Sequence, residues 1–223
     1  MLQLYFRTAW NDYFPATSTM NLNSQTPSSR QELTDKGVYV SNCLFRSISS
    51  SNHGGALYCT SVTYFLVESS SFISCKTSSN NGGAIYFSNS GGGQSVLHEV
   101  CGYDCCSTHS SYQYFQFACI YVRNSISSKN YINYSSISRC VSEHSNSLYT
   151  LCLCYGTILC SSVNMSLNKC YARSIYFLLS SDSSSDTRSF TYSSFSDNIL
   201  AGYTLFCLCR TDAKYEIKNC NIL

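Results

Sequence analysis

The sequence predicts an all-β protein built as a parallel β-helix, in which short strands stack coil upon coil. One observation is a double glycine leading into an apolar strand, GGALY at 54–58 and GGAIY at 82–86, which start 28 residues apart. Another is an apolar residue three positions before a cysteine, which recurs along the chain. The third is the use of Ser, Tyr, Phe, Ile, Val, Thr and Cys, which suit pleated strands better than helices. A repeat of this length fits one coil of a β-solenoid, with about three strands in each coil.

The cysteine motif predicts the number of coils and part of the core. Its copies end at Cys75, Cys105, Cys140, Cys170 and Cys220. The copy at 102–105 begins with glycine, and the one at 195–198 ends in asparagine. The spacing predicts about seven coils of roughly 28–30 residues. Because equivalent residues of stacked coils lie above one another, we expect these cysteines to form a ladder in the core. The other predicted core residues are Leu57, Phe72, Ile85, Ile137, Leu167 and Ile217.

The paired glycines have a predicted structural role. A coil must turn a corner between its faces, and glycine permits a positive φ or a close backbone approach because it has no Cβ. We therefore place Gly54, Gly55, Gly82 and Gly83 at equivalent corners of two neighbouring coils.

These motifs resemble those of a known family. GGALY and GGAIY, interleaved with FISC at 72–75, are similar to the GGAI and FxxN repeats of polymorphic outer-membrane-protein-like chains. That family includes chlamydial surface proteins and cysteine-rich surface proteins of trichomonad parasites, and the cysteine-ending motif is closer to the trichomonad version. The resemblance extends from about Val38 to Leu223, with the glycine motif intact twice. It implies a right-handed parallel β-helix displayed at a cell surface, with a role in adhesion or immune exposure, and it brings no catalytic residues.

Residues 1–36 do not follow the repeat. They contain the only tryptophan, Trp10, both prolines and a polar run at 17–30. We expect an irregular segment or a cap over the first coil, since an open solenoid end exposes unpaired strand edges. Residues 37–223 then form the β-helix domain. No secretory signal or bilayer-spanning stretch is found, so we expect a piece of a longer surface protein.

Composition argues against a nucleic-acid partner and for the cell exterior. Charged residues make up 12% of the chain, the net charge is +2, and no basic patch is present; a usual charged fraction is about 25%. Sequons at Asn133 and Asn164 are candidate glycosylation sites for a chain that enters the secretory route. We therefore expect a non-enzymatic cell-surface or secreted protein that binds a host or matrix protein or a glycan, without a cofactor.

Fifteen cysteines leave the redox state open. A ladder of buried free thiols and an extracellular disulfide framework both fit this count. The pair Cys152 and Cys154 recurs as Cys207 and Cys209, which predicts that the two pairs lie on the same face of the solenoid, two layers apart. The metal-site alternative rests on a compact His/Cys group whose spacing matches no standard zinc finger: His98, Cys101, Cys105, Cys106 and His109.

Three alternatives to an adhesion role remain. A carbohydrate-active, pectate-lyase-like enzyme, either a polysaccharide lyase or a glycoside hydrolase, needs paired acids on one outer face. The candidate pairs are Asp182 with Asp212 and Asp186 with Glu216. Sugar binding by a tyrosine stripe would use Tyr112, Tyr114 and Tyr121. The last alternative is a truncated fragment without an independent function.

Overall fold

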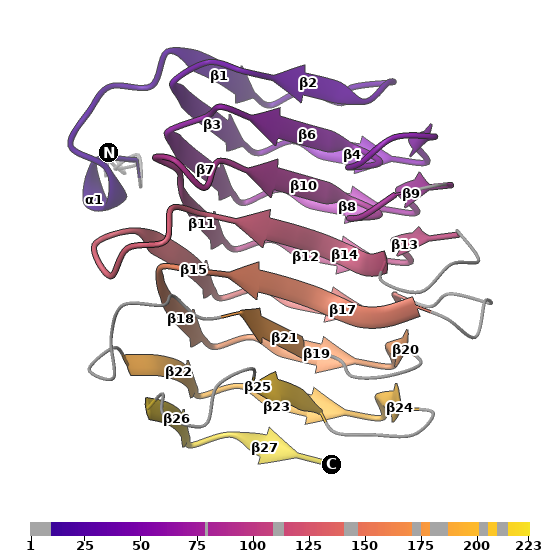
Figure 1. Cartoon of the computed structure of the whole chain (residues 1–223). Helices are drawn as coiled ribbons and strands as arrows, with labels where there is room; N and C mark the ends of the chain where they lie inside the picture. The colour runs from indigo at the N-terminus through magenta and orange to yellow at the C-terminus, as the bar shows by residue number, and fades with distance from the viewer. Residues whose placement is uncertain are drawn as a thin grey trace, which may run out of the picture.

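The computed structural model is a parallel β-solenoid, which confirms the predicted fold class (Figure 1). It describes residues 10–78, 80–108, 114–140, 147–170, 175–178, 187–200, 205–208 and 214–223. Three long sheets wrap around one core, and every strand pair between coils is parallel. The single helix of the described residues is α1 (Trp10–Tyr13), which lies beside the solenoid (Figure 1).

Each complete coil contributes one strand to each of the three long sheets; in the described residues the first coil lacks a sheet C strand and the last lacks a sheet B strand. Within the described residues, sheet A has eight strands: β1 (Met20–Asn23), β3 (Gly37–Ser41), β7 (Tyr64–Glu68), β11 (Gln94–His98), β15 (Lys129–Asn133), β18 (Thr157–Ser161), β22 (Thr187–Thr191) and β26 (Lys214–Lys218). Over the same residues, sheet B has seven: β2 (Gln31–Leu33), β6 (Leu57–Thr60), β10 (Ile85–Ser88), β14 (Tyr114–Tyr121), β17 (Ser147–Cys154), β21 (Ile175–Leu178) and β25 (Phe206–Leu208).

Sheet C closes the coil. Among the described residues its strands are β4 (Leu44–Arg46), β8 (Ser71–Ile73), β12 (Cys101–Tyr103), β16 (Ser136–Ser138), β19 (Asn164–Ser166), β23 (Ser194–Ser196) and β27 (Asn221–Ile222). Short strands continue the turn from sheet C towards sheet B: β5 (Ser49–Ser50), β9 (Lys76–Thr77), β13 (Cys106–Ser107), β20 (Lys169–Cys170) and β24 (Ile199–Leu200).

The corners between sheets repeat one backbone device. The residue after each sheet A strand has a positive φ: Ser24, Asn42, Ser69, Glu99, Tyr134, Ser162, Tyr192 and Asn219. The residue after the sheet C strands has one as well, at Ser47, Ser74, Asp104, Arg139, Leu167 and Asp197. A single left-handed residue bends the chain from one sheet into the next, at a cost of roughly 1–2 kcal/mol for a side chain with a Cβ. These corners therefore need no glycine and leave little trace in the sequence.

The corner that enters sheet B does require glycine. Gly54 and Gly82 have φ values of 65° and 73°. A Cβ on Gly55 would lie 2.0 Å from the Gly83 carbonyl oxygen, and one on Gly83 would lie 2.3 Å from the Gln116 oxygen. The first glycine of each pair thus provides the turn, and the second lets the backbones of neighbouring coils approach.

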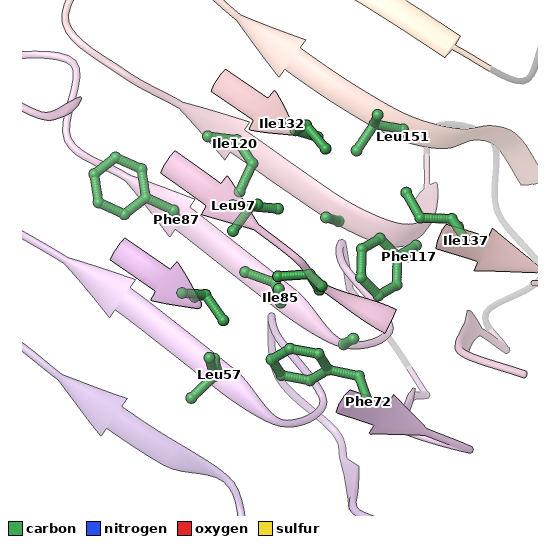
Figure 2. Packing of buried hydrophobic residues seen from close by; sticks show 14 of the residues in the cluster. Leu57, Phe72, Ile85, Phe87, Leu97, Phe117, Ile120, Ile132, Ile137 and Leu151 are labelled. Carbon is green, nitrogen blue, oxygen red and sulfur yellow. The ribbon is translucent and has the colours of Figure 1, made fainter. Parts of the chain in front are cut away.

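The core lies between the three sheets and consists of stacked columns of equivalent residues. Leu57, Ile85, Phe72 and Ile137 are all fully buried, as predicted, and they point into the interior (Figure 2). Phe45 stacks on Phe72 with ring centroids 4.8 Å apart. Aromatic and aliphatic columns of this kind contribute most of the apolar burial that stabilises a solenoid.

Two predicted core residues are wrong. Leu167 is 44% exposed because it is the left-handed corner residue after β19, and Met165 fills the core position of that strand. Ile217 is 46% exposed because it lies on β26, the last strand of sheet A in the described residues, where only the preceding coil covers it.

The start of the β-helix also differs from the prediction. Residues 1–36 were expected to be irregular or a cap, but β1 pairs with β3 and β2 pairs with β6. The coils therefore begin near residue 20, inside the predicted N-terminal segment. This coil could not be recognised from the sequence, because the polar run at 17–30 contains few apolar residues. One of them, Leu22, is buried.

Candidate functional site: a polar cleft on sheet A

The outer face of sheet A carries a column of large side chains. Strand residues alternate between the two faces of a sheet, so the inward positions of β7 are Phe65 and Val67 and the outward ones include Leu66. Leu66 and its neighbour in the next coil, Val96, are nevertheless fully buried. Something must therefore cover this face, and the N-terminal segment, residues 10–18, does so.

Aromatic packing and hydrogen bonds hold the N-terminal segment on sheet A. Trp10 and Phe14 are buried against the column, with the Phe14 ring 5.1 Å from that of Tyr64. Lys129 Nζ donates to the carbonyl oxygen of Tyr13 over 2.7 Å. The segment crosses sheet A at Gly37. A Cβ there would lie 3.1 Å from the Thr17 carbonyl oxygen, so the glycine allows the two backbones to approach closely. The segment thus spans several coils on the outside of the solenoid.

A cleft of about 960 Å³ lies between this segment and the upper coils of sheet A. Its described lining comes from the segment, from outward positions of β1, β3 and β7, and from the left-handed corners: Trp10, Asn11, Thr17, Ser18, Asn21, Asn23, Tyr39, Ser41, Asn42, Glu68, Ser69 and Glu99. Amides, hydroxyls, two carboxylates and two aromatic rings meet here. No Lys or Arg is among these lining residues, so the cleft carries negative charge.

The two carboxylates of the cleft are held by neighbouring hydroxyl groups. The Tyr39 hydroxyl donates a hydrogen bond to Glu68. Ser69 Oγ donates to Glu99 Oε2 over 2.6 Å. Burial and the neighbouring Glu68 raise the pKa of the Tyr39 phenol, which keeps it protonated as a donor. The carboxylate orientations are therefore set before any ligand arrives.

The amide side chains are held in the same way. Ser18 Oγ donates to Asn21 Oδ1 over 2.7 Å, and Ser41 Oγ donates to Asn23 Oδ1 over 3.0 Å. These bonds fix the orientation of each amide, and the NH₂ groups supply hydrogen-bond donors for a ligand.

This site was not predicted from the sequence. Its residues lie between 10 and 99, at outward strand positions and corners that no short motif marks. The sequence feature that could have indicated it is the group of aromatic residues in the N-terminal segment, because such residues usually pack against another surface of the protein.

The predicted cysteine ladder is present in three coils, and asparagine takes the place of cysteine in the next two. Cys75, Cys105 and Cys140 are fully buried at equivalent positions after β8, β12 and β16. Register places Asn168 and Asn198 at the next two steps. Cys75 Sγ donates to Phe45 O over 3.5 Å, and Asn168 Nδ2 donates to Ile137 O over 2.9 Å. Thiol and amide thus serve the same carbonyl position of the preceding coil.

Cys170 and Cys220 do not belong to this ladder, which corrects the prediction. Cys170 lies in β20 and pairs with Leu200 of β24. Cys220 follows the corner residue Asn219, so it is equivalent to Cys43, which follows Asn42. Both Cys43 and Cys220 donate to the carbonyl two residues earlier, at 3.3 and 3.4 Å. Motif spacing assigned them to the wrong column because two different corners each place a cysteine three residues after an apolar position.

The glycine at position 102, where the other copies of the motif have an apolar residue, has a tertiary explanation. Gly102 occupies the column of Phe72, and a Cβ there would lie 2.4 Å from the ring of Phe117. Phe117 comes from a bulged stretch of β14 and packs edge-on against Phe72, 6.2 Å between centroids. One aromatic ring from sheet B therefore replaces the ring missing from sheet C.

A second group of thiols lies outside the main core. Cys119 pairs in register with Cys152, and Cys152 Sγ is 3.2 Å from Cys154 Sγ. Burial raises the pKa of the Cys119 and Cys152 thiols. Register places Cys207 two layers from Cys152 in sheet B, as predicted, while Cys209 lies outside the described residues. Buried, protonated thiols of this kind are chemically inert packing groups.

The remaining candidates are placed only in part. Among the residues that the structure describes, no group of three or more His, Cys, Asp or Glu side chains could hold a metal ion, and His109 lies outside them. Asp182, Asp186, Asp212 and Tyr112 also lie outside, so neither predicted acid pair is described. Asn164 is exposed, whereas Asn133 Nδ2 donates to the Tyr13 hydroxyl over 3.4 Å. Tyr121 is half-buried against the second thiol group.

The comparisons add no relative. No family model, curated protein or solved structure matches the chain. Within its described part, no helix has the length and apolar character needed to cross a membrane.

Proposed function

We propose that this chain is a non-enzymatic cell-surface or secreted β-helix protein that binds a host or matrix protein or a glycan. The observation that carries the proposal is the cleft on sheet A. Its carboxylates and amides are oriented by hydroxyl groups of the protein itself, so a ligand meets a prepared polar surface. Preorganised polar groups lower the ordering cost of binding. The resemblance to polymorphic outer-membrane-protein-like chains supports placement at a cell surface.

A binding experiment tests the proposed role. Purified protein is passed over immobilised matrix proteins and fixed animal cells, and saturable binding is measured. We expect binding that falls in Glu68→Gln and persists in Asp197→Asn. Asp197 is the control, because it is an exposed carboxylate at the corner after β23 of sheet C and is not among the residues that line the cleft. If none of the tested surfaces shows saturable binding, the interaction role is refuted.

The predicted compartment has a separate test. Protein from its native source is mapped by mass spectrometry for thiol state and for glycans at Asn133 and Asn164. A glycan on the exposed Asn164 supports the secretory route. Free thiols throughout, together with bare asparagines, contradict surface display.

A carbohydrate-active enzyme is the second candidate, and one feature of the cleft favours it. Glu68 and Glu99 are two carboxylates lining one groove, the residue type on which glycoside hydrolysis depends. Turnover on a polysaccharide panel that is lost in both Glu68→Gln and Glu99→Gln would support this candidate over the binding role.

A further inference from the structure

We infer that the cleft on sheet A binds an uncharged oligosaccharide. This inference rests on the proposed binding role and names the class of ligand. Four features of the lining support it: the hydroxyl partners of its carboxylates, its donors and acceptors, its charge and its partly exposed aromatic ring.

The carboxylates show which group the cleft accepts. Both already receive hydrogen bonds from hydroxyls of the protein, Glu68 from Tyr39 and Glu99 from Ser69. An ionised carboxylate has about four acceptor sites, so each retains capacity for further hydroxyl donors. Neighbouring hydroxyls of a sugar ring present such donors in pairs.

The amides complement these acceptors. Asn21 and Asn23 accept from Ser18 and Ser41 through their oxygens, which orients the amides, and their NH₂ groups supply donors. A sugar hydroxyl both donates and accepts, so it can bond a carboxylate and an amide at once. A ligand that only accepts would leave the carboxylates unsatisfied.

Charge excludes an anionic ligand. The described lining holds two carboxylates and neither Lys nor Arg. His98, which is not among the lining residues, places its Nε2 3.9 Å from Glu99 Oε1. Uronic acids, sulfated sugars and phosphates would meet like charge, which disfavours their binding.

The Tyr39 ring gives the cleft an apolar wall. Tyr39 is half-buried and is backed by the buried Trp10, with the ring planes inclined at 48° and centroids 5.8 Å apart. The C–H face of a sugar ring packs on such surfaces, as apolar contacts do in most ligand sites. The volume of about 960 Å³ is near the upper end of the roughly 300–1,000 Å³ typical of ligand sites, which leaves room for more than one linked ring.

The test is a glycan array followed by calorimetric titration of the full chain. The array holds neutral, amino, uronic and sulfated oligosaccharides. We expect neutral oligosaccharides to bind, with about a tenfold or greater loss of affinity in Glu68→Gln. Glu99→Gln provides a second variant, at an exposed corner. Asp197→Asn, at an exposed corner of sheet C, should bind like the parent chain.

The outcomes separate this inference from the proposed function. Binding to acidic or amino sugars alone, or to no glycan while matrix binding persists, overturns the ligand class and leaves the interaction role standing. Hydrolysis or lysis of a neutral oligosaccharide, lost in Glu68→Gln, supports the ligand class and overturns the non-enzymatic role. Neutral binding unaffected by both Glu68→Gln and Glu99→Gln places the ligand elsewhere and overturns the site.

Discussion

Asn168 offers the sharpest test of the ladder that links the coils. Its side chain is fully buried. Asn168 Oδ1 accepts from the Cys140 amide over 2.9 Å, and Nδ2 donates to the Ile137 carbonyl, also over 2.9 Å, and to Asn198 Oδ1 over 3.0 Å. Replacing Asn168 with alanine removes every one of these bonds while leaving the partners in the interior.

The expected loss follows from the groups left without partners. A buried donor or acceptor that loses its bond costs about 1–3 kcal/mol. The Cys140 amide and the Ile137 carbonyl both lose theirs, so Asn168→Ala should lower the free energy of unfolding by about 2–6 kcal/mol. Asn168→Cys should cost less, because a thiol serves the same carbonyl position at Cys75 and Cys105.

Urea denaturation followed by circular dichroism measures this loss. With a slope of about 2 kcal/mol per molar urea, the midpoint should fall by roughly 1–3 M. Hydrogen exchange should also show lost protection of the Cys140 amide. Asn164→Ala, at an exposed position of the preceding strand, is the control and should change stability by about 0.5 kcal/mol or less. Equal midpoints for Asn168→Ala and Asn164→Ala would refute the ladder.

Three further predictions concern the corner, the N-terminal segment and the thiols. Gly82→Ala should lower the melting temperature, because φ is 73° and the new Cβ would lie 2.1 Å from a backbone oxygen; Gly92→Ala, with open space, should not, and equal melting would contradict the corner role. Leu66→Asp should release the N-terminal segment and shift the fluorescence of Trp10, the only tryptophan, to the red; an unchanged spectrum argues against the docking. Burial raises the pKa of the Cys160 thiol, so its stabilisation is complete below about pH 8.5 and is lost as the pH rises above that value. Urea midpoints between pH 7 and 10 under reducing conditions should therefore fall less steeply in Cys160→Val, and parallel curves would exclude this thiol as a cause.

Local motifs were informative where the structure depends on the backbone conformation of a few neighbouring residues. The paired glycines marked a corner because only glycine fits the positive φ of Gly82 and the close approach at Gly83. The repeated Phe72–Cys75 motif marked a strand followed by an inward corner residue. From these two signals, the parallel β-helix and most of its central core could be predicted.

The same motif failed where register decides. Leu167 and Cys170 have the motif spacing, but the neighbouring coil places Met165 and Asn168 in those columns. A spacing of three residues cannot show which of several corners a cysteine follows, since pairing with the next coil selects the column. Register is set by contacts about 30 residues apart in the chain.

The sequence by itself determined the fold class, because the backbone conformation of glycine corners and of strand-forming residues depends mainly on the residues themselves. Only the tertiary structure decided how Phe117 fills the space above Gly102, and that the N-terminal segment lies along sheet A. The cleft exists because Trp10 packs near Tyr39 while Glu68 arrives from the following coil. Such a site is created by stacking and docking, which bring together residues whose local sequences carry no common signal.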